Sequence, residues 1–154
     1  MKRVSSSGLL TTGLLIATAL LVGCSSSATE NKTTTNGKCG DEQKISVTDH
    51  ISSQISAFEQ KNWDKAYGYA SASFQESINK DAFQAIILRQ YSFLINNSGY
   101  TFGDCTANPE GILQNITIKS DSQTYELIYN LILEEGALGI DAATILTASE
   151  NVAI

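Results

Sequence analysis

The chain has 154 residues with ten Lys or Arg, 16 Asp or Glu and one His, which gives a formal net charge of −6. Nucleic acids are bound by basic surfaces, so this acidic balance argues against a nucleic-acid partner. One His and three Cys, spread along the chain, do not supply the clustered ligands of a zinc or iron site, and no metal or other cofactor is expected.

The N-terminus has the parts of a bacterial export signal. Lys2 and Arg3 precede an apolar core from about Leu9 to Val22, and the small residue Gly23 follows it. A helix that crosses a membrane needs about 20 apolar residues, and this core is shorter and rich in Gly, Thr and Ser. An export signal, rather than a membrane span, is therefore the favoured interpretation.

The run Leu20-Leu21-Val22-Gly23-Cys24 resembles the lipobox of bacterial lipoproteins. The resemblance implies that residues 1–23 are a cleaved signal peptide, that the Cys24 sulfur carries a diacylglycerol, and that the new amine usually carries a third acyl chain. One acyl chain binds a bilayer only reversibly, whereas two or three anchor a protein stably. The expected location is the extracytoplasmic face of the cell membrane or outer membrane, and Ser25 in place of Asp favours the outer membrane where two membranes exist.

Cleavage would leave residues 24–154, with eight basic and 16 acidic side chains and a net charge of −8. Residues 25–43 are Ser, Thr, Asn, Lys and Gly with hardly an apolar side chain, so 24–43 is expected to be an acylated anchor and flexible tether. Residues 44–154 then form one domain, just large enough for its own core. Anionic headgroups repel such a domain, so the lipid would provide the attachment to the membrane.

Two cysteines remain once Cys24 is acylated. Cys39 and Cys105 would lie in an oxidising environment, where a disulfide is permitted. A bridge between them would close a loop of about 66 residues and add roughly 4 kcal/mol to stability on the chain-entropy model. The alternative is a buried thiol at Cys105 and an exposed one at Cys39.

Three helices are expected in the first half of the domain. The first covers about 46–60, with Ser46 or Thr48 as its cap. Asn62 can cap a short second helix that reaches about residue 70, and 71–77 is interpreted as a connecting turn. A third helix is expected to open at Asn79 and reach about residue 94, before the stop signal at 96–99.

After Gly99 the apolar period changes from 3.6 to 2, which predicts four strands near 100–104, 112–118, 125–133 and 138–145. Short polar connections between consecutive strands favour an antiparallel meander. The expected class is α+β, with three N-terminal helices packed on a curved four-stranded antiparallel sheet.

The helical region resembles the opening of nuclear transport factor 2-like domains in Ala57-Phe58, Asn62-Trp63-Asp64-Lys65-Ala66-Tyr67, Ala70-Ser71 and Phe74. Phe83, Tyr91 and the strand from Tyr125 to Gly136 continue the resemblance, which covers about 51–145 and is closest to small bacterial envelope members. It implies a cone with a cavity between sheet and helices, used in the family for isomerase or dehydratase chemistry or for ligand binding, or left filled. In the closing strand, 139–143 is small and lacks the aromatic residue that often follows the turn.

Five aromatic side chains are candidates for lining this cavity: Trp63, Tyr67, Tyr91, Tyr125 and Tyr129. Isomerase chemistry of the ketosteroid type needs a carboxylate base and a neutral donor that face one cavity. Phenols could donate, but Glu126 has outward parity, Asp104 lies near a strand end, and Asp141 has two possible orientations. No catalytic residue is assigned, and core packing remains the alternative to a ligand cavity.

The outward parity of the 125–133 strand carries Ile128 and Ile132, which suggests a surface for a homodimer or an envelope protein partner. The alternatives are two ordinary surface isoleucines, or cover by the chain after Thr147.

The expected function is a membrane-anchored envelope lipoprotein with a non-catalytic domain that binds a protein partner or a small apolar ligand. The alternative is an enzyme or small-molecule binder that uses the cavity, with Tyr67, Tyr91, Tyr125 or Tyr129 as donors. A purely structural spacer is the third possibility.

Overall fold

The computed structural model describes residues 37–121 and 123–150, in which the helices lie between a short first strand and the four long strands of a sheet. The elements are β1 (Gly37–Lys38), α1 (Asp41–Glu59), α2 (Trp63–Tyr67), α3 (Ala72–Ser77), α4 (Lys80–Gln90), the 3-10 turn η1 (Ser92–Leu94), β2 (Gly99–Asn108), β3 (Gly111–Ser120), β4 (Gln123–Glu134) and β5 (Ala137–Glu150). The α+β class and the antiparallel meander are confirmed. Within these residues the sheet has five strands rather than four, and there are four α-helices rather than three.

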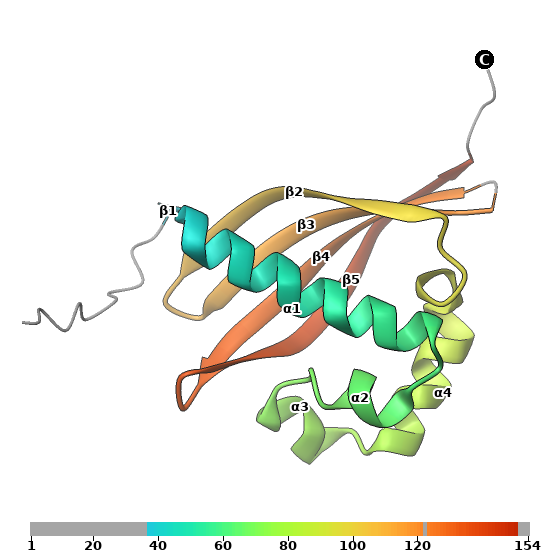
Figure 1. Cartoon of the computed structure of the whole chain (residues 1–154), viewed down its shortest axis with the longest axis horizontal. Helices are drawn as coiled ribbons and strands as arrows, with labels where there is room; N and C mark the ends of the chain where they lie inside the picture. The colour runs from blue at the N-terminus through green and yellow to red at the C-terminus, as the bar shows by residue number, and fades with distance from the viewer. Residues whose placement is uncertain (1–36, 122, 151–154) are drawn as a thin grey trace, which may run out of the picture. The chain divides into compact units, whose positions relative to one another are not determined.

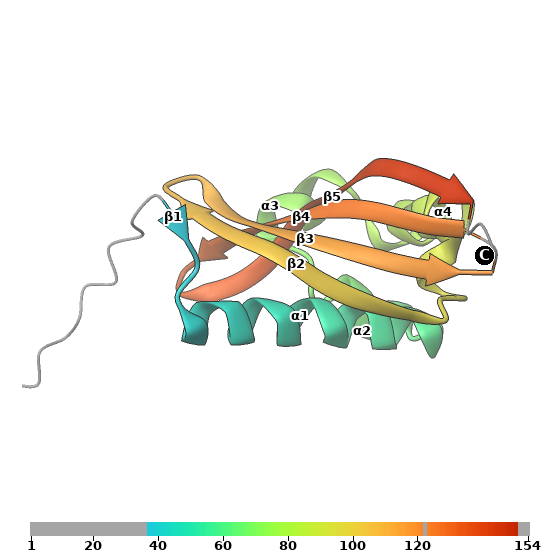
Figure 2. The ribbon, with the colours of Figure 1, turned by 90° about the horizontal axis from the view of Figure 1, so that it is seen from above.

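The strands follow one another in the order β1-β2-β3-β4-β5, and every pair is antiparallel. The register shifts between Phe102 and Cys105 in β2, and twice along the β4–β5 pair. Such bulges bend a strand and increase its twist. Figures 1 and 2 show the twisted sheet with α1 along one face, while α2, α3 and α4 gather beyond β5.

The core lies between α1 and the face of the sheet that it covers. Residues at helical spacing on α1 meet alternate residues of the central strands, and all are 0–2 % exposed: Val47, Ile51, Ile55, Phe58, Ile116, Ile118, Leu127 and Leu131. Full burial of such a side chain contributes about 1.5–3 kcal/mol. The predicted inward parity of the strand around Leu127, Tyr129 and Leu131 is therefore confirmed.

The helices differ from the expectation at several places, and the second one ends at Tyr67 rather than near residue 70. α1 begins at Asp41 rather than near residue 46, so Ser46 and Thr48 are not its caps; the acidic pair Asp41 and Glu42 occupies the first turn, where the helix dipole favours negative charge. The predicted turn at 71–77 is wrong, because Ser71 accepts a hydrogen bond from the Phe74 amide and opens α3. The third expected helix is α4, which ends at Gln90, and the separate 3-10 turn η1 follows it. Caps at Asn62 and Asn79 are present as predicted.

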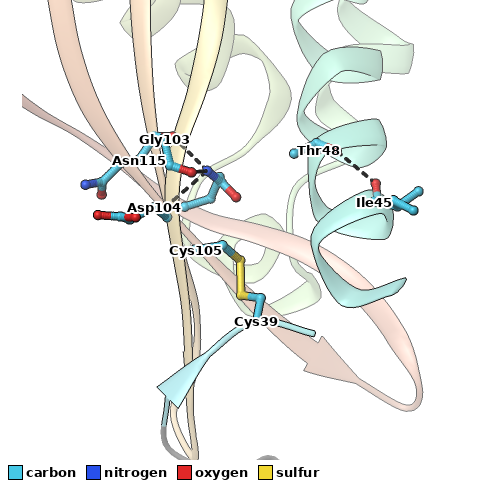
Figure 3. Close-up of a disulfide and its surroundings, with 8 residues drawn as sticks. Cys39, Ile45, Thr48, Gly103, Asp104, Cys105 and Asn115 are labelled. Atoms are coloured by element: carbon cyan, nitrogen blue, oxygen red, sulfur yellow. Dashed lines mark hydrogen bonds between the residues drawn. A yellow bond between two sulfur atoms is a disulfide. The ribbon is translucent and has the colours of Figure 1, made fainter. Parts of the chain in front are cut away.

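Cys39 and Cys105 form a disulfide, with a Cα–Cα distance of 5.4 Å (Figure 3). The Cys39 amide also donates to the carbonyl of Cys105 at 3.0 Å, and β1 pairs with the end of β2. Residues 37–43, which were expected in the tether, therefore belong to the fold as β1, the disulfide segment and the first turn of α1.

Reduction of this disulfide should destabilise the domain. The cysteines are 66 residues apart. Closing a loop of that length stabilises the folded state by roughly 4 kcal/mol on the chain-entropy model. When a reductant is added to the wild type, the free energy of unfolding measured with urea should fall by about this amount. A C39S/C105S variant should unfold like the reduced wild type and should not respond to reductant. Equal urea midpoints for oxidised and reduced wild type would contradict the prediction.

Candidate functional site

A cavity of about 220 Å³ lies between the helices and the β5 side of the sheet. Its walls come from α1, α3, α4, β4 and β5 and are mostly apolar, with Phe58, Phe74, Phe83, Ile87, Leu94 and Ile140 among them. An apolar cavity of about 150 Å³ is enough to take up benzene. The space is therefore large enough for a small molecule of roughly one ring with substituents.

The closing strand contributes a small residue to the wall. Ala143 pairs with the inward-facing Tyr129 and lines the cavity near Ile140, so a larger side chain at this position would fill part of the space. On the other side, the Phe83 ring is held by Phe58 and Phe74, with ring centroids 5.8 and 5.9 Å away. Because this aromatic packing holds the wall in place, the wall cannot collapse into the cavity without losing packing contacts.

Two of the five predicted pocket residues line this cavity, Tyr91 and Tyr129. The other three pack elsewhere. The Trp63 ring contacts Phe58, with centroids 6.4 Å apart.

Tyr67 and Tyr125 do not line the cavity, and each has a hydrogen bond of its own. The Tyr67 hydroxyl donates to the carbonyl of Ile78 at 2.8 Å. Tyr125 stacks on Phe93 at 3.9 Å and its hydroxyl donates to Gln123. Core packing, the alternative considered for the aromatic set, describes these two residues and Trp63.

The two tyrosines in the wall differ in their hydrogen bonds. Tyr91 donates its hydroxyl to the carbonyl of Ala143 at 2.7 Å, which ties the end of α4 to β5. Tyr129 is 1 % exposed, and its hydroxyl has no hydrogen-bond partner among the described residues. Burial, with smaller effects of Tyr91 and Tyr100, raises the pKa of Tyr129 far above its ordinary value. Tyr129 is therefore a neutral phenol at any physiological pH.

Asp141 supplies a carboxylate to the same cavity. Its Oδ1 accepts hydrogen bonds from the hydroxyls of Ser71 at 2.9 Å and Ser73 at 3.1 Å. Alternation along the strand left its direction open, and a register shift decides it: Leu131 pairs with Ile140 but Asn130 pairs with Ala142, so Asp141 is the extra residue of a bulge.

A second carboxylate fastens α3 to the β4–β5 hairpin. Glu134 accepts hydrogen bonds from the amides of Ala72 and Ser73, and these amides open the helix. A Cβ built on Gly139 would lie 2.5 Å from the Cα of Ser71, so the close approach of α3 to β5 requires glycine. These contacts hold Phe74 in the cavity wall and were missed by sequence reasoning, because their partners lie more than 60 residues apart.

Ile128, Ile132 and Glu126 lie outside the cavity wall. Ile128 and Ile132 are half-buried on the outward parity of β4, and neighbouring Glu126 is exposed and accepts a hydrogen bond from Thr147. Through Glu150, β5 pairs with β4, so the chain from Thr147 to Glu150 does not fold over them. Cys24 falls outside the described residues.

Across the described ranges, no group of three His, Cys, Asp or Glu side chains could hold a metal ion. No helix in that part of the chain has both the length and the apolar character needed to cross a membrane.

The contacts of Glu134 predict a pH dependence of stability. The hydrogen bond from the Ala72 amide is the main cause that lowers the pKa of Glu134 in the fold. Since the folded pKa lies below the unfolded one, the stabilisation is complete above the unfolded pKa and is lost as pH falls through the folded pKa.

Between about pH 6 and about pH 3, the wild type should therefore lose more free energy of unfolding than E134Q, measured by urea unfolding. E135Q removes the adjacent carboxylate, which does not cap α3. Its free energy of unfolding should fall as much over this pH range as that of the wild type. Parallel pH profiles for wild type and E134Q would show that Glu134 does not stabilise the start of α3.

The family model described as a domain of unknown function (DUF4864) matches residues 40–153. No curated protein matches the chain. No solved structure matches it either. Because the family match runs from the residue that precedes α1 to beyond the end of β5, the chain belongs to the DUF4864 family.

Proposed function

We propose that the protein is a membrane-anchored envelope lipoprotein whose domain binds a small, largely apolar ligand in the cavity between α4 and β5. The observation that carries the proposal is the cavity itself, about 220 Å³ in volume and walled mainly by apolar side chains. Water gains few hydrogen bonds in such a space, whereas a hydrocarbon group gains about 0.8 kcal/mol for each buried methylene.

Charge narrows the class of ligand. Asp141 places a carboxylate in the cavity wall, and a mature chain would carry a net charge of −8. An anionic group inside the cavity would be repelled at short range with little screening by salt. The favoured ligand is therefore neutral. It is also expected to be small, because the volume of the cavity lies below the usual range of pockets that bind drug-sized molecules.

The anchor and the finer fold assignment are part of the same proposal. The signal, small residue and Cys24 support lipidation, which would place the cavity next to a membrane, a reservoir of apolar molecules. Helices followed by a meander, with a cavity between them, support the nuclear transport factor 2-like cone. A homodimer or envelope partner at Ile128 and Ile132 stays a prediction.

An isomerase-like enzyme is the second candidate. Asp141 and the neutral phenol of Tyr129 line one cavity, which is the combination of base and donor that such chemistry needs. It ranks second because Asp141 is only half-buried and its Oδ1 already accepts two serine hydroxyls. The test is the rate at which the methyl protons of acetophenone exchange with deuterated water. A faster exchange with the wild type than with D141N would favour the enzyme.

Replacement of the lipidated cysteine tests the anchor. C24S should leave the chain uncut and without acyl groups in its native host, because the thioether needs the sulfur atom. Intact-mass spectrometry and membrane fractionation should show the loss of the lipid mass. S26A, two residues along the tether, should be processed like the wild type. An unmodified Cys24 in the wild type would contradict the proposal.

Filling the cavity tests ligand binding. Ile86 lies in the wall on α4, whereas Leu88 on the same helix is 48 % exposed and outside the wall. The probe is α-methylstyrene, a neutral hydrocarbon of suitable size, and its binding is measured by ligand-observed NMR.

I86W should weaken binding of the probe by about tenfold or more, since the indole would occupy its space, and L88W should change it by less than about twofold. Equal affinities of I86W and wild type would place the probe elsewhere. No binding to the wild type would remove the support for a ligand cavity.

A further inference from the structure

We infer that the cavity selects a ligand with a neutral hydrogen-bond acceptor, such as a ketone, ester or lactone oxygen, which receives the hydroxyl proton of Tyr129. The inference rests on the proposed function and names the chemical class of its ligand. It starts from a polar atom that the fold buries without a partner.

The Tyr129 side chain is 1 % exposed, and its hydroxyl makes no hydrogen bond to any described residue. Buried polar groups in folded proteins are nearly always paired, because an unpaired one forfeits its hydrogen bonds with water. A buried hydroxyl without a protein partner, on a residue that lines a cavity, therefore points to a partner supplied from outside the chain.

The other polar side chains of the wall are already engaged. Tyr91 donates to the carbonyl of Ala143, Gln54 donates to the carbonyl of Ala66, and Asp141 accepts from two serine hydroxyls. Tyr129 is thus the donor that the wall leaves free, and the high pKa of its phenol keeps the proton on the oxygen. A neutral acceptor fits this donor, whereas an anion would meet the carboxylate of Asp141.

A trapped water is the competing explanation. Gln114 faces Tyr129 across the β3–β4 pair, and its Oε1 is also buried without a partner among the described residues. A water could bridge the two side chains and satisfy both. Removing the Tyr129 hydroxyl distinguishes a bound water from a free donor, because the two cases differ in the expected change of protein stability and of ligand preference.

The first experiment is a cycle between protein and ligand. Acetophenone and α-methylstyrene have the same shape and differ in having C=O or C=CH₂, and their dissociation constants are measured by NMR titration for the full-length protein and for Y129F. The wild type should prefer acetophenone over α-methylstyrene more strongly than Y129F does. The ratio of the two association constants should be roughly 3- to 10-fold lower in Y129F, which corresponds to the loss of one hydrogen bond.

An unchanged ratio with both compounds bound overturns the inference and leaves the apolar cavity of the proposed function intact. Absence of binding by both compounds to the wild type overturns the proposed function as well. The two failures are therefore distinguishable.

The second experiment measures urea unfolding without ligand, with Y91F as the matched control. Y91F removes the hydroxyl that donates to Ala143 and should be less stable than the wild type. Y129F should be as stable as the wild type or more so, because it removes an unpaired hydroxyl and leaves the ring in place. A loss in Y129F as large as that in Y91F would mean that the hydroxyl is already satisfied, which overturns the inference.

Discussion

The pairing of β4 along both of its edges, with β3 and with β5, determines the direction of the β4 side chains, including that of Tyr129 in the cavity wall. Along β4, Leu127, Tyr129 and Leu131 face α1 while Glu126 faces outward, and a slip of one residue would reverse all of them. The energy of the buried face therefore holds Tyr129 at the cavity, even though its own hydroxyl is unpaired. Among the described residues, the Tyr129 hydroxyl and the Oε1 of Gln114 are the buried side-chain atoms left without a partner.

The bulge at Asp141 and the attachment of α3 complete the site from the other side. The extra residue brings a carboxylate into the wall, and Ser71 and Ser73 bind it at the start of α3. Since Glu134 binds the same helix through its amides, the wall residue Phe74 depends on two acids of the hairpin. This arrangement couples the shape of the cavity to a short helix in which no residue is fully buried.

Sequence patterns predicted the elements whose signals are local. Alternation along 125–133 predicted the buried side chains of Leu127, Tyr129 and Leu131, although Leu133 at the end of the strand is 55 % exposed. Asn62 and Asn79 indicated two helix starts. The existence of α3 and the direction of Asp141 were not predictable, because a carboxylate more than 60 residues away and a bulge decide them. Aromatic character alone did not separate Tyr129, in the cavity wall, from Tyr125, which stacks on Phe93.

Ligand binding by this domain requires that an apolar molecule enters the space next to Tyr129. Intermolecular NOEs between bound α-methylstyrene and the methyl groups of the protein test this directly. The predicted result is contacts with Ile87 and Ile140, which line the cavity. Contacts confined to Ile145 and Leu146, which are exposed on β5, would show that the probe binds the surface and would contradict the account.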